Sequence, residues 1–231
     1  MKVTQIAESA WQLTQLGFVN CYLVRESDGF SLIDTGVLGG GAKEIVETAR
    51  GLGGTIRRIL LTHAHGDHVG GVDGLIAASD VELISDARSL PLLQKPPVKT
   101  LQAGEAAGTV RGSLPGINAK PTKLVSDGES CGVFRCIATP GHIPGHIAFL
   151  DERDGTLYAG DALVGIGHLA VSGFAPWFFP LPNFATWNKA VALASAEKLL
   201  RYSIERFACG HGGMKSGGVA TLWRAVADAK A

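Results

Sequence analysis

The chain has 231 residues, enough for one domain with a sizeable core or for two small domains. Hydrophobic residues make up 46% and charged residues 18%, which is typical of a globular protein, and the formal net charge of zero argues against a nucleic-acid partner. No apolar run is long enough for a transmembrane helix, and the N-terminus lacks the apolar core of a secretion signal. We therefore expect a cytoplasmic protein that binds neither membranes nor nucleic acids, with its four cysteines as reduced, mostly buried thiols.

Predicted strands and helices alternate along the chain, as in an α/β protein. Strand-forming runs fill most of residues 3–35, whereas residues 95–123 and 164–183 show no clear period and are expected to be irregular. The other expected elements, in chain order, are helix 42–52, strand 56–61, helix 69–78, strand 81–85, helix 87–94, strand 132–137, hairpin 147–158, helix 186–201 with Trp187, Ala190, Val191 and Ala194 on one face, strand 204–209, and a final helix with Leu222, Ala225, Val226 and Ala229 on its inner face.

The densest chemical signal is the stretch Thr62-His63-Ala64-His65-Gly66-Asp67-His68. It follows a predicted buried strand and precedes a predicted helix, so its side chains leave a rigid strand end close together. Neutral imidazole nitrogens and carboxylate oxygens are metal ligands. Four such side chains in seven residues are hard to fit around one ion, so the stretch favours a centre with two metals.

Acidic or imidazole side chains also follow four other predicted strands. They are Asp34, His142, Asp161 and His211. Because strand ends converge on one edge of a sheet, we expect these side chains to meet. His146 fits a structural role better than that of a ligand, and His168 is expected on the surface or in a loop.

Two segments of the sequence look alike. Leu32-Ile33-Asp34 and the segment 157–161 are both apolar strands that end on an aspartate with a buried character. This likeness allows two related halves, each with strands followed by helices, and predicts sheets in the middle with helices outside.

Six aromatic residues crowd the stretch between residues 173 and 187, which prolines stiffen. The stretch lies between Asp161 and His211 in the sequence, so both its ends are expected near the strand-end side chains. Two interpretations stay open: a core or dimer contact, compatible with a homodimer, and an apolar wall of a pocket for a small-molecule substrate. The candidate pocket residues are Phe174, Trp177, Phe178, Phe179 and Phe184.

Taken in order, these motifs resemble those of the metallo-β-lactamase superfamily. The matching motifs are Ile-Asp-Thr-Gly at Asp34, His-x-His-x-Asp-His from His63 to His68, Thr-Pro-Gly-His at His142, Gly-Asp at Asp161 and Gly-His-Gly at His211, and they span residues 18–212. The resemblance implies an α/β (α+β) fold of the four-layer αββα metallo-β-lactamase sandwich type, formed as a single domain by residues 1–231. It also implies an active site at one edge of the two sheets.

Residue by residue, the resemblance implies a binuclear zinc site. The first metal would be held by His63, His65 and His142, the second by Asp67, His68 and His211, and Asp161 would bridge the two. The nitrogen and oxygen donors suit zinc, and iron or manganese are open alternatives. Asp34 and His146 would support the ligands without binding metal.

The implied function is that of a metal-dependent hydrolase of a small ester, lactone or thioester. A hydroxide shared by two metals would attack the substrate, and Asp67 would orient this nucleophile and pass its proton to the leaving group. The alternatives are a persulfide dioxygenase-like oxidoreductase with one iron, a phosphodiesterase or phosphorylcholine esterase, and a non-catalytic binding protein.

Four features of the sequence distinguish it from particular members of the superfamily that it resembles. Dedicated β-lactamases lack a bridging aspartate such as Asp161, so antibiotic hydrolysis is not expected as the main activity. His65 stands where flavo-diiron proteins have glutamate, which argues against an oxygen-reducing centre. Only 20 residues follow His211, so the helical domain of glyoxalase II-type thioesterases is not expected. No tyrosine follows Asp161 before Tyr202, which argues against acyl-homoserine lactonase chemistry.

Overall fold

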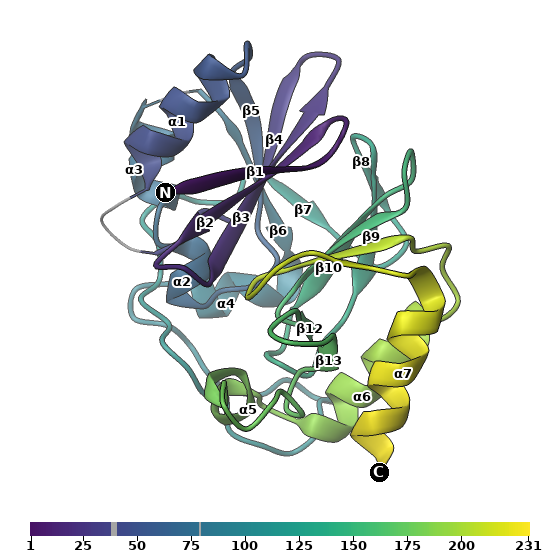
Figure 1. The fold of residues 1–231 in the computed structure, drawn as a ribbon. Helices are drawn as coiled ribbons and strands as arrows, with labels where there is room; N and C mark the ends of the chain where they lie inside the picture. Colours follow the sequence, from purple (N-terminus) through teal and green to yellow (C-terminus); the bar gives the residue numbers. More distant parts are fainter. Residues whose placement is uncertain (38–40, 79) are drawn as a thin grey trace. The chain divides into compact units, whose positions relative to one another are not determined.

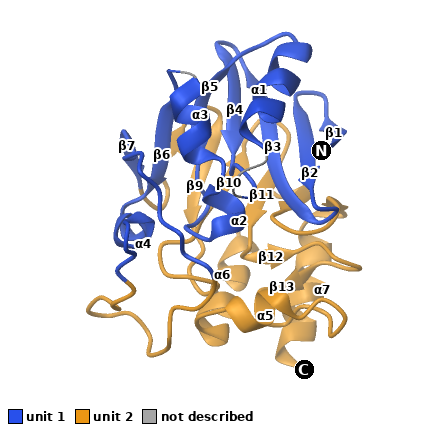
Figure 2. Ribbon diagram, turned by 90° about the vertical axis from the view of Figure 1, so that its left-hand side faces the viewer, with its two compact units in different colours: residues 1–98, 113–125 blue, residues 99–112, 126–231 orange. Residues whose placement is uncertain are grey.

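The computed structural model describes residues 1–37, 41–78 and 80–231. The chain divides into two compact units, which Figure 2 shows in different colours. Unit 1 comprises residues 1–98 and 113–125, and unit 2 comprises residues 99–112 and 126–231. Each unit has a main sheet of its own and helices of its own. The prediction of a single domain over residues 1–231 stays a prediction.

Within the described residues (Figure 1), the sheet of unit 1 has seven strands that lie in sequence order, as Figure 2 shows. The first four strands pair antiparallel, and the last four run parallel to one another. The strands are β1 (Lys2–Ala7), β2 (Ala10–Gln15), β3 (Val19–Glu26), β4 (Gly29–Ile33), β5 (Ile56–Leu60), β6 (Glu82–Asp86) and β7 (Lys123–Val125). The helices are α1 (Ala42–Gly51), α2 (Gly66–Val69), α3 (Val72–Ala78), the 3-10 helix η1 (Ala87–Ser89) and α4 (Leu90–Leu93).

The parallel strands β4 and β5 place the histidine stretch. Their last residues are apolar and fully buried, as is usual for parallel strands covered on both faces. Since the two strands run in the same direction, the residues after Ile33 and after Leu60 leave the sheet at the same edge. The predicted helix 69–78 corresponds to α3, whereas α2 lies almost wholly within the histidine stretch that was expected to form a turn. A Cβ on Gly71 would lie 2.7 Å from the carbonyl oxygen of Thr35, so this position requires glycine.

In unit 2, the described residues form a sheet of six strands in the order β15-β14-β11-β10-β9-β8 and a separate two-stranded ribbon of β12 and β13. The strands are β8 (Ser130–Cys131), β9 (Phe134–Ala138), β10 (Ile147–Asp151), β11 (Thr156–Gly160), β12 (Leu163–Val164), β13 (Ala170–Val171), β14 (Arg206–Cys209) and β15 (Lys215–Ser216). The helices are α5 (Leu181–Ala185), α6 (Lys189–Leu199) and α7 (Gly218–Lys230).

Strand directions bring three chain segments of unit 2 to one sheet edge. β9 and β11 are both antiparallel to β10, so they point the same way, and β14 is parallel to β11. The segments that follow Ala138, Gly160 and Cys209 therefore begin at this edge. Helices α6 and α7 contact each other and supply apolar side chains to the hydrophobic core of this unit, including Leu199 and Leu222.

The predicted inner face of helix 186–201 is wrong. The helix begins at Lys189, where the Oδ1 of Asn188 accepts a hydrogen bond from the Val191 amide at 3.1 Å. Its buried residues are Ala192, Ser195, Ala196 and Leu199, whereas Ala190 and Ala194 are exposed. The prediction assumed that Trp187 lies on the buried face of the helix. Trp187 is buried, but it precedes the helix, so the residues counted from it fall on other faces.

The cysteines and the first of the two stretches expected to be irregular agree with the sequence. The expectation of an irregular stretch at 164–183 is wrong, because this stretch contains β13 and the start of α5 and is joined to β12 by the pairing of β12 with β13. From Gln94 to Thr122, all of which the structure describes, the chain forms no helix or strand. All four cysteines are buried. Among the described residues, no helix is both long enough and apolar enough to cross a membrane.

Candidate metal centre

Unit 1 gathers the histidine stretch behind the ends of β4 and β5. The side chains of His63, His65 and His68 are buried, with exposed fractions of 1%, 4% and 0%. The ring centroids of His63 and His68 are 4.1 Å apart, and those of His63 and His65 are 4.8 Å apart. The stretch therefore forms one tight cluster of imidazoles, as the sequence predicted for this part of the site.

Asp34 lies beside this cluster and accepts hydrogen bonds through both carboxylate oxygens. Its Oδ1 accepts from the Thr62 amide at 2.8 Å, and its Oδ2 accepts from Thr62 Oγ1 and from His68 Nδ1, each at 2.7 Å. The backbone of Asp34 has a φ of 58°, a left-handed conformation that aspartate tolerates better than most residues. This turn directs the carboxylate back toward the end of β5.

The hydroxyl of Thr62 fixes the tautomer of His63. Thr62 Oγ1 has a single proton, which it donates to the Asp34 carboxylate. The contact of 3.0 Å between Thr62 Oγ1 and His63 Nδ1 therefore requires that His63 donates from Nδ1. In the neutral rings of His63 and His68, the proton thus lies on Nδ1 and the lone pair on Nε2. This is the arrangement of a histidine that binds a metal through Nε2.

The spacing of His63 and His65 fits a shared metal. The Nε2 of His63 lies 3.1 Å from the Nδ1 of His65. Two nitrogens that bind one tetrahedral zinc at its usual bond length lie about 3.3 Å apart. Both nitrogens therefore lie at the separation of neighbouring ligands, and the buried donor set of unit 1 fits a metal ion.

Asp67 differs from the histidines in its exposure. Its side chain is 35% exposed, and its Oδ2 lies 4.0 Å from the Nε2 of His68. It sits in α2, whose first amide, that of Gly66, donates to the Ser113 carbonyl at 2.9 Å. This helix keeps Asp67 beside His68 while leaving its carboxylate accessible to solvent.

Unit 2 brings together the other three predicted ligands at its own sheet edge. The Oδ2 of Asp161 lies 3.4 Å from His142 Nε2 and 3.1 Å from His211 Nε2. All three side chains are buried, with exposed fractions of 1–5%. One carboxylate oxygen between two imidazole nitrogens has the spacing of neighbouring ligands, so this donor set also fits metal binding.

The turn that carries His142 is fixed by the start of α6. The Trp187 amide donates to the His142 carbonyl at 2.8 Å, and the Asn188 amide donates to the Gly141 carbonyl at 2.9 Å. Gly141 has a φ of 136°, and a Cβ there would lie 2.2 Å from the backbone nitrogen of Ala192. Glycine is therefore required in the Thr-Pro-Gly-His motif by both conformation and space.

His146 uses both ring nitrogens within unit 2. Its Nε2 accepts a hydrogen bond from the Asp161 amide at 3.0 Å, so its Nδ1 carries the proton and donates to Thr139 Oγ1 at 2.8 Å. This arrangement fits the predicted supporting role. His168, in contrast, is exposed.

Two hydroxyl residues beside His142 were not predicted from the sequence. Its Nδ1 lies 2.9 Å from Ser172 Oγ and 3.3 Å from Thr186 Oγ1. Ser172 lies in the stretch expected to be irregular, and Thr186 lies at the expected start of a helix. No motif marks them, since an isolated serine or threonine is common in any loop.

Cys209 is buried at the end of β14, two residues before His211. Burial, together with the nearby Asp161 carboxylate, raises the pKa of its thiol far above the usual range. The thiolate is the nucleophilic form of cysteine. Cys209 therefore acts as a small apolar side chain, and the site contains no activated cysteine at this position.

The aromatic stretch divides into exposed and packed side chains. Phe179 lies with its ring centroid 5.7 Å from that of His211. Phe174 packs against the hydrophobic core of unit 2. Trp177, Phe178 and Phe184 are exposed by 88%, 55% and 68%. The pocket and dimer interpretations of these residues both stay predictions, and the contact of Phe179 with His211 places one aromatic ring of the stretch beside a predicted ligand.

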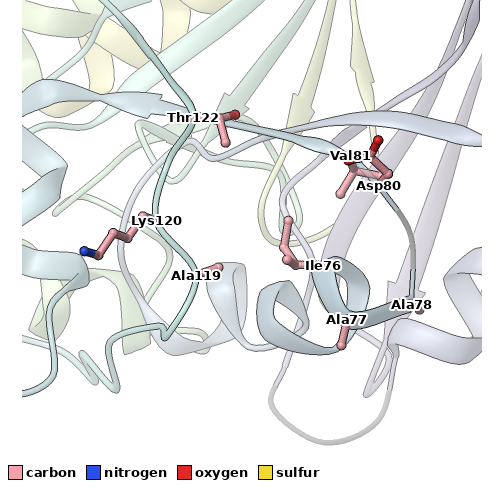
Figure 3. Close-up of a pocket in the computed structure, with 8 residues that line it drawn as sticks. All are labelled: Ile76, Ala77, Ala78, Asp80, Val81, Ala119, Lys120 and Thr122. Atoms are coloured by element: carbon pink, nitrogen blue, oxygen red, sulfur yellow. The ribbon is translucent and has the colours of Figure 1, made fainter.

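A surface pocket of about 640 Å³ lies elsewhere in unit 1, beside α3 (Figure 3). Its lining residues are Ile76, Ala77, Ala78, Asp80, Val81, Ala119, Lys120 and Thr122. None of them is a histidine or a predicted site residue. The pocket therefore offers no competing metal centre.

Comparison with protein families and curated proteins gives three findings. A family model described as the metallo-beta-lactamase superfamily matches residues 14–211. The chain is 43% identical over 217 residues to an uncharacterized protein of Bacillus subtilis, YobT, covering 92% of this chain and 91% of that protein. It is 28% identical over 187 residues to the atrochrysone carboxyl ACP thioesterase of Aspergillus fumigatus, covering 79% of this chain but 38% of that protein.

Solved structures confirm the predicted fold class. TTHA1623, determined in a di-iron-bound form, is 26% identical, and the match covers 93% of this chain and 96% of that chain with a TM-score of 0.66. The metallo-beta-lactamase DIM-1 is 16% identical, and the match covers 99% of this chain and 96% of that chain with a TM-score of 0.72. The second likeness shows the fold alone.

Proposed function

Because the chain belongs to the metallo-β-lactamase superfamily and is a metallo-hydrolase of that class, we propose that it hydrolyses a small ester, lactone or thioester at a centre of two zinc ions. One observation carries the proposal. Within each unit, ring nitrogens and carboxylate oxygens converge at the spacing of metal ligands, with distances of 3.1 Å in unit 1 and 3.1 and 3.4 Å in unit 2.

The proposed centre takes its ligands from both clusters. The first ion would be held by His63, His65 and His142, the second by Asp67, His68 and His211, and Asp161 would bridge them. When bound, such ions lower the pKa of a bound water and polarise the oxygen of the substrate. Nitrogen and oxygen donors support zinc, while the di-iron form of TTHA1623 supports iron as the alternative metal.

The protein's own residues orient these groups and move the proton. Asp34 holds His68 directly and His63 through Thr62, which keeps both Nε2 atoms available as donors. The His146 ring holds the backbone of Asp161 in place. Asp67 is accessible to solvent, so its carboxylate would accept a proton from the attacking water and return it to the leaving group.

The apolar stretch supports a substrate with an apolar acyl part. Phe179 lies beside His211, and its ring would exclude water from that side of the centre. Trp177 and Phe184 offer further apolar surface in the same unit. The relative named as an ACP thioesterase supports a thioester, and the zero net charge speaks against a polyanionic substrate.

A substrate panel with the metal-loaded protein tests the proposal. The panel contains a thioester, a lactone, a p-nitrophenyl ester, a phosphodiester and a cephalosporin. We expect turnover of at least one of the first three, abolished by His63→Ala and retained by His168→Ala, which changes an exposed histidine outside both clusters. Turnover confined to the phosphodiester or the cephalosporin, or failure on all five, would overturn the proposal.

A further inference from the structure

A chain of hydroxyl groups in unit 2 leads away from His142. Its Nδ1 lies 2.9 Å from Ser172 Oγ, which lies 2.9 Å from Thr186 Oγ1. Thr186 Oγ1 in turn donates a hydrogen bond to the Pro182 carbonyl at 2.6 Å. Ser172 is 0% exposed and Thr186 is 5% exposed, so bulk water is kept from these groups.

The proton count fixes the direction of this chain. A contact of 2.6 Å between a hydroxyl oxygen and a carbonyl oxygen needs a proton between them, and only Thr186 can supply it. With its single proton used, Thr186 must accept from Ser172. With the Ser172 proton used, Ser172 must accept from His142. The neutral His142 ring therefore carries its proton on Nδ1 and its lone pair on Nε2, the nitrogen 3.4 Å from Asp161 Oδ2.

We propose that Ser172 and Thr186 are positioning residues that hold His142 in the Nδ1–H tautomer and orient its Nε2 for metal binding. The inference rests on the ligand role of His142 in the proposed function and adds two residues that no motif marks. Without these two hydroxyl groups, the imidazole of His142 is able to rotate and to exchange its proton between its two nitrogens. Partners of this kind typically contribute about 10–100-fold to metal affinity or activity.

The hydrogen bonds through Ser172 and Thr186 also connect His142 to the aromatic stretch 173–187. The last acceptor, Pro182, lies in α5, and the same carbonyl accepts from the Thr186 amide at 3.0 Å. The next residue, Asn183, is joined to the backbone of Ala175 by two hydrogen bonds of 2.7 and 2.8 Å. The segment that displays the exposed Phe184 is thus joined to the ring of His142 by hydrogen bonds through Thr186.

Variants of Thr186 and Ser172 separate the hydroxyl from the shape of the side chain. Thr186→Val keeps the shape and removes the hydroxyl, Thr186→Ser keeps the hydroxyl, and Ser172→Ala removes the nearer of the two hydroxyl oxygens beside His142 Nδ1. Thr221→Val is the matched control, because Thr221 Oγ1 also donates to a backbone carbonyl, at 3.0 Å, but lies at the start of α7. Zinc affinity is measured by competition with a chelator, and nitrogen-15 spectra of the metal-free protein report the histidine tautomers, with His142 assigned from His142→Gln.

We expect Thr186→Val and Ser172→Ala to weaken zinc binding about 10–100-fold, Thr186→Ser to restore it and Thr221→Val to leave it unchanged. The wild-type spectrum should show His142 as the Nδ1–H tautomer, and Ser172→Ala should show a mixture. Wild-type affinity in Thr186→Val and Ser172→Ala overturns the inference. So does an Nε2–H tautomer in the wild-type protein, a result that does not depend on any variant folding.

The same experiment separates this inference from the proposed function. A wild-type protein that fails on the substrate panel, but whose zinc affinity depends on both hydroxyls, refutes the hydrolase proposal and supports the positioning role. His142→Gln with unchanged zinc affinity refutes the ligand role on which both depend. The tautomer of His142 in the wild-type spectrum still decides whether the hydroxyl chain runs from the imidazole to the Pro182 carbonyl.

Discussion

The two clusters orient their histidines by different means. In unit 1, the hydrogen bonds from His63 and His68 end on the buried carboxylate of Asp34. In unit 2, the hydrogen bonds from His142 end on the neutral carbonyl of Pro182. Hydrogen bonds to a charged acceptor are roughly twice as strong as neutral ones. We infer that the imidazoles of unit 1 are held more firmly than that of His142 in unit 2, whose hydrogen bonds lead to the apolar stretch.

This contrast predicts that Asp34→Asn weakens metal binding more than any single change in the hydroxyl chain. The amide leaves one acceptor oxygen where the carboxylate has two, and both His63 and His68 lose part of their support. We expect a loss of metal affinity of about 100-fold or more, measured by chelator competition, because two ligands are affected. Asp28→Asn is the control, since Asp28 is half exposed and pairs with Arg58. If Asp34→Asn loses less metal affinity than Thr186→Val, unit 1 does not hold its histidines more firmly than unit 2.

A side chain at Gly141, in the turn that carries His142, should destabilise the protein strongly. In Gly141→Ala, the new Cβ meets the Ala192 backbone at 2.2 Å, in addition to the strain of the positive φ. We expect a loss of about 3 kcal/mol in the free energy of unfolding, measured with urea. Gly128 also has a positive φ, of 81°, but a Cβ there would meet no atom within 4 Å. Gly128→Ala should therefore lower the free energy of unfolding by only about 1 kcal/mol. Equal losses would show that the contact with α6 does not constrain the turn.

The apolar stretch should affect substrate binding and leave the chemistry intact. Trp177→Ala removes an indole that is 88% exposed. With a thioester that carries a long apolar acyl chain, we expect KM to rise several-fold at unchanged kcat, since uniform binding is lost. Trp223→Ala, at an indole that is 62% exposed on α7, is the matched control. If both variants behave alike in steady-state kinetics, the pocket interpretation of Trp177 is wrong.

The smallest predicted effect concerns acid stability in unit 2. Burial acts to raise the pKa of Asp127, but hydrogen bonds from Lys198 and from the Ala138 amide outweigh it and hold the pKa below its ordinary range. A pKa that is lowered in the folded state stabilises the protein above the unfolded pKa, and this stability is lost as pH falls through the folded pKa. Asp127→Asn should therefore lower the free energy of unfolding by up to about 1 kcal/mol at neutral pH. This loss should shrink as the pH falls through the lowered pKa of Asp127.

A pH series of urea unfolding measures this difference. In unit 1, Asp73 provides the comparison, because the Ala119 and Asn118 amides and Lys95 also hold its pKa below the ordinary range against the effect of burial. Asp73→Asn should show the same dependence on pH. A cost of Asp127→Asn that is constant from neutral to acid pH would argue against a lowered pKa at this carboxylate.

The sequence predicted best what is local in the chain. His63, His65, Asp67 and His68 lie within six consecutive residues, so their clustering required only a strand end and a turn. The sites at Asp161 and His211 could also be anticipated, because side chains after neighbouring parallel strands meet at one edge. Periodicity predicted most helices and strands of both units, since burial imposes a regular pattern on them.

What the sequence could not predict depends on tertiary packing. The buried face of α6 was assigned wrongly, because Asn188 starts the helix after Trp187 and shifts its phase. Ser172 and Thr186 reach His142 only because the residue after β13 and the residue after α5 lie against the same ring. No local pattern carries that information, so such supporting hydroxyls become visible only in three dimensions.

The central claim is that hydrolysis depends on metal held by these two clusters. The direct measurement strips the protein with a chelator, returns zinc stepwise, and follows bound metal and thioester hydrolysis together. We predict that the metal-free protein is inactive, that activity returns as two ions bind per chain, and that Asp34→Asn requires more zinc than the wild-type protein. Hydrolysis that is the same before stripping, after stripping and after zinc return would contradict the claim.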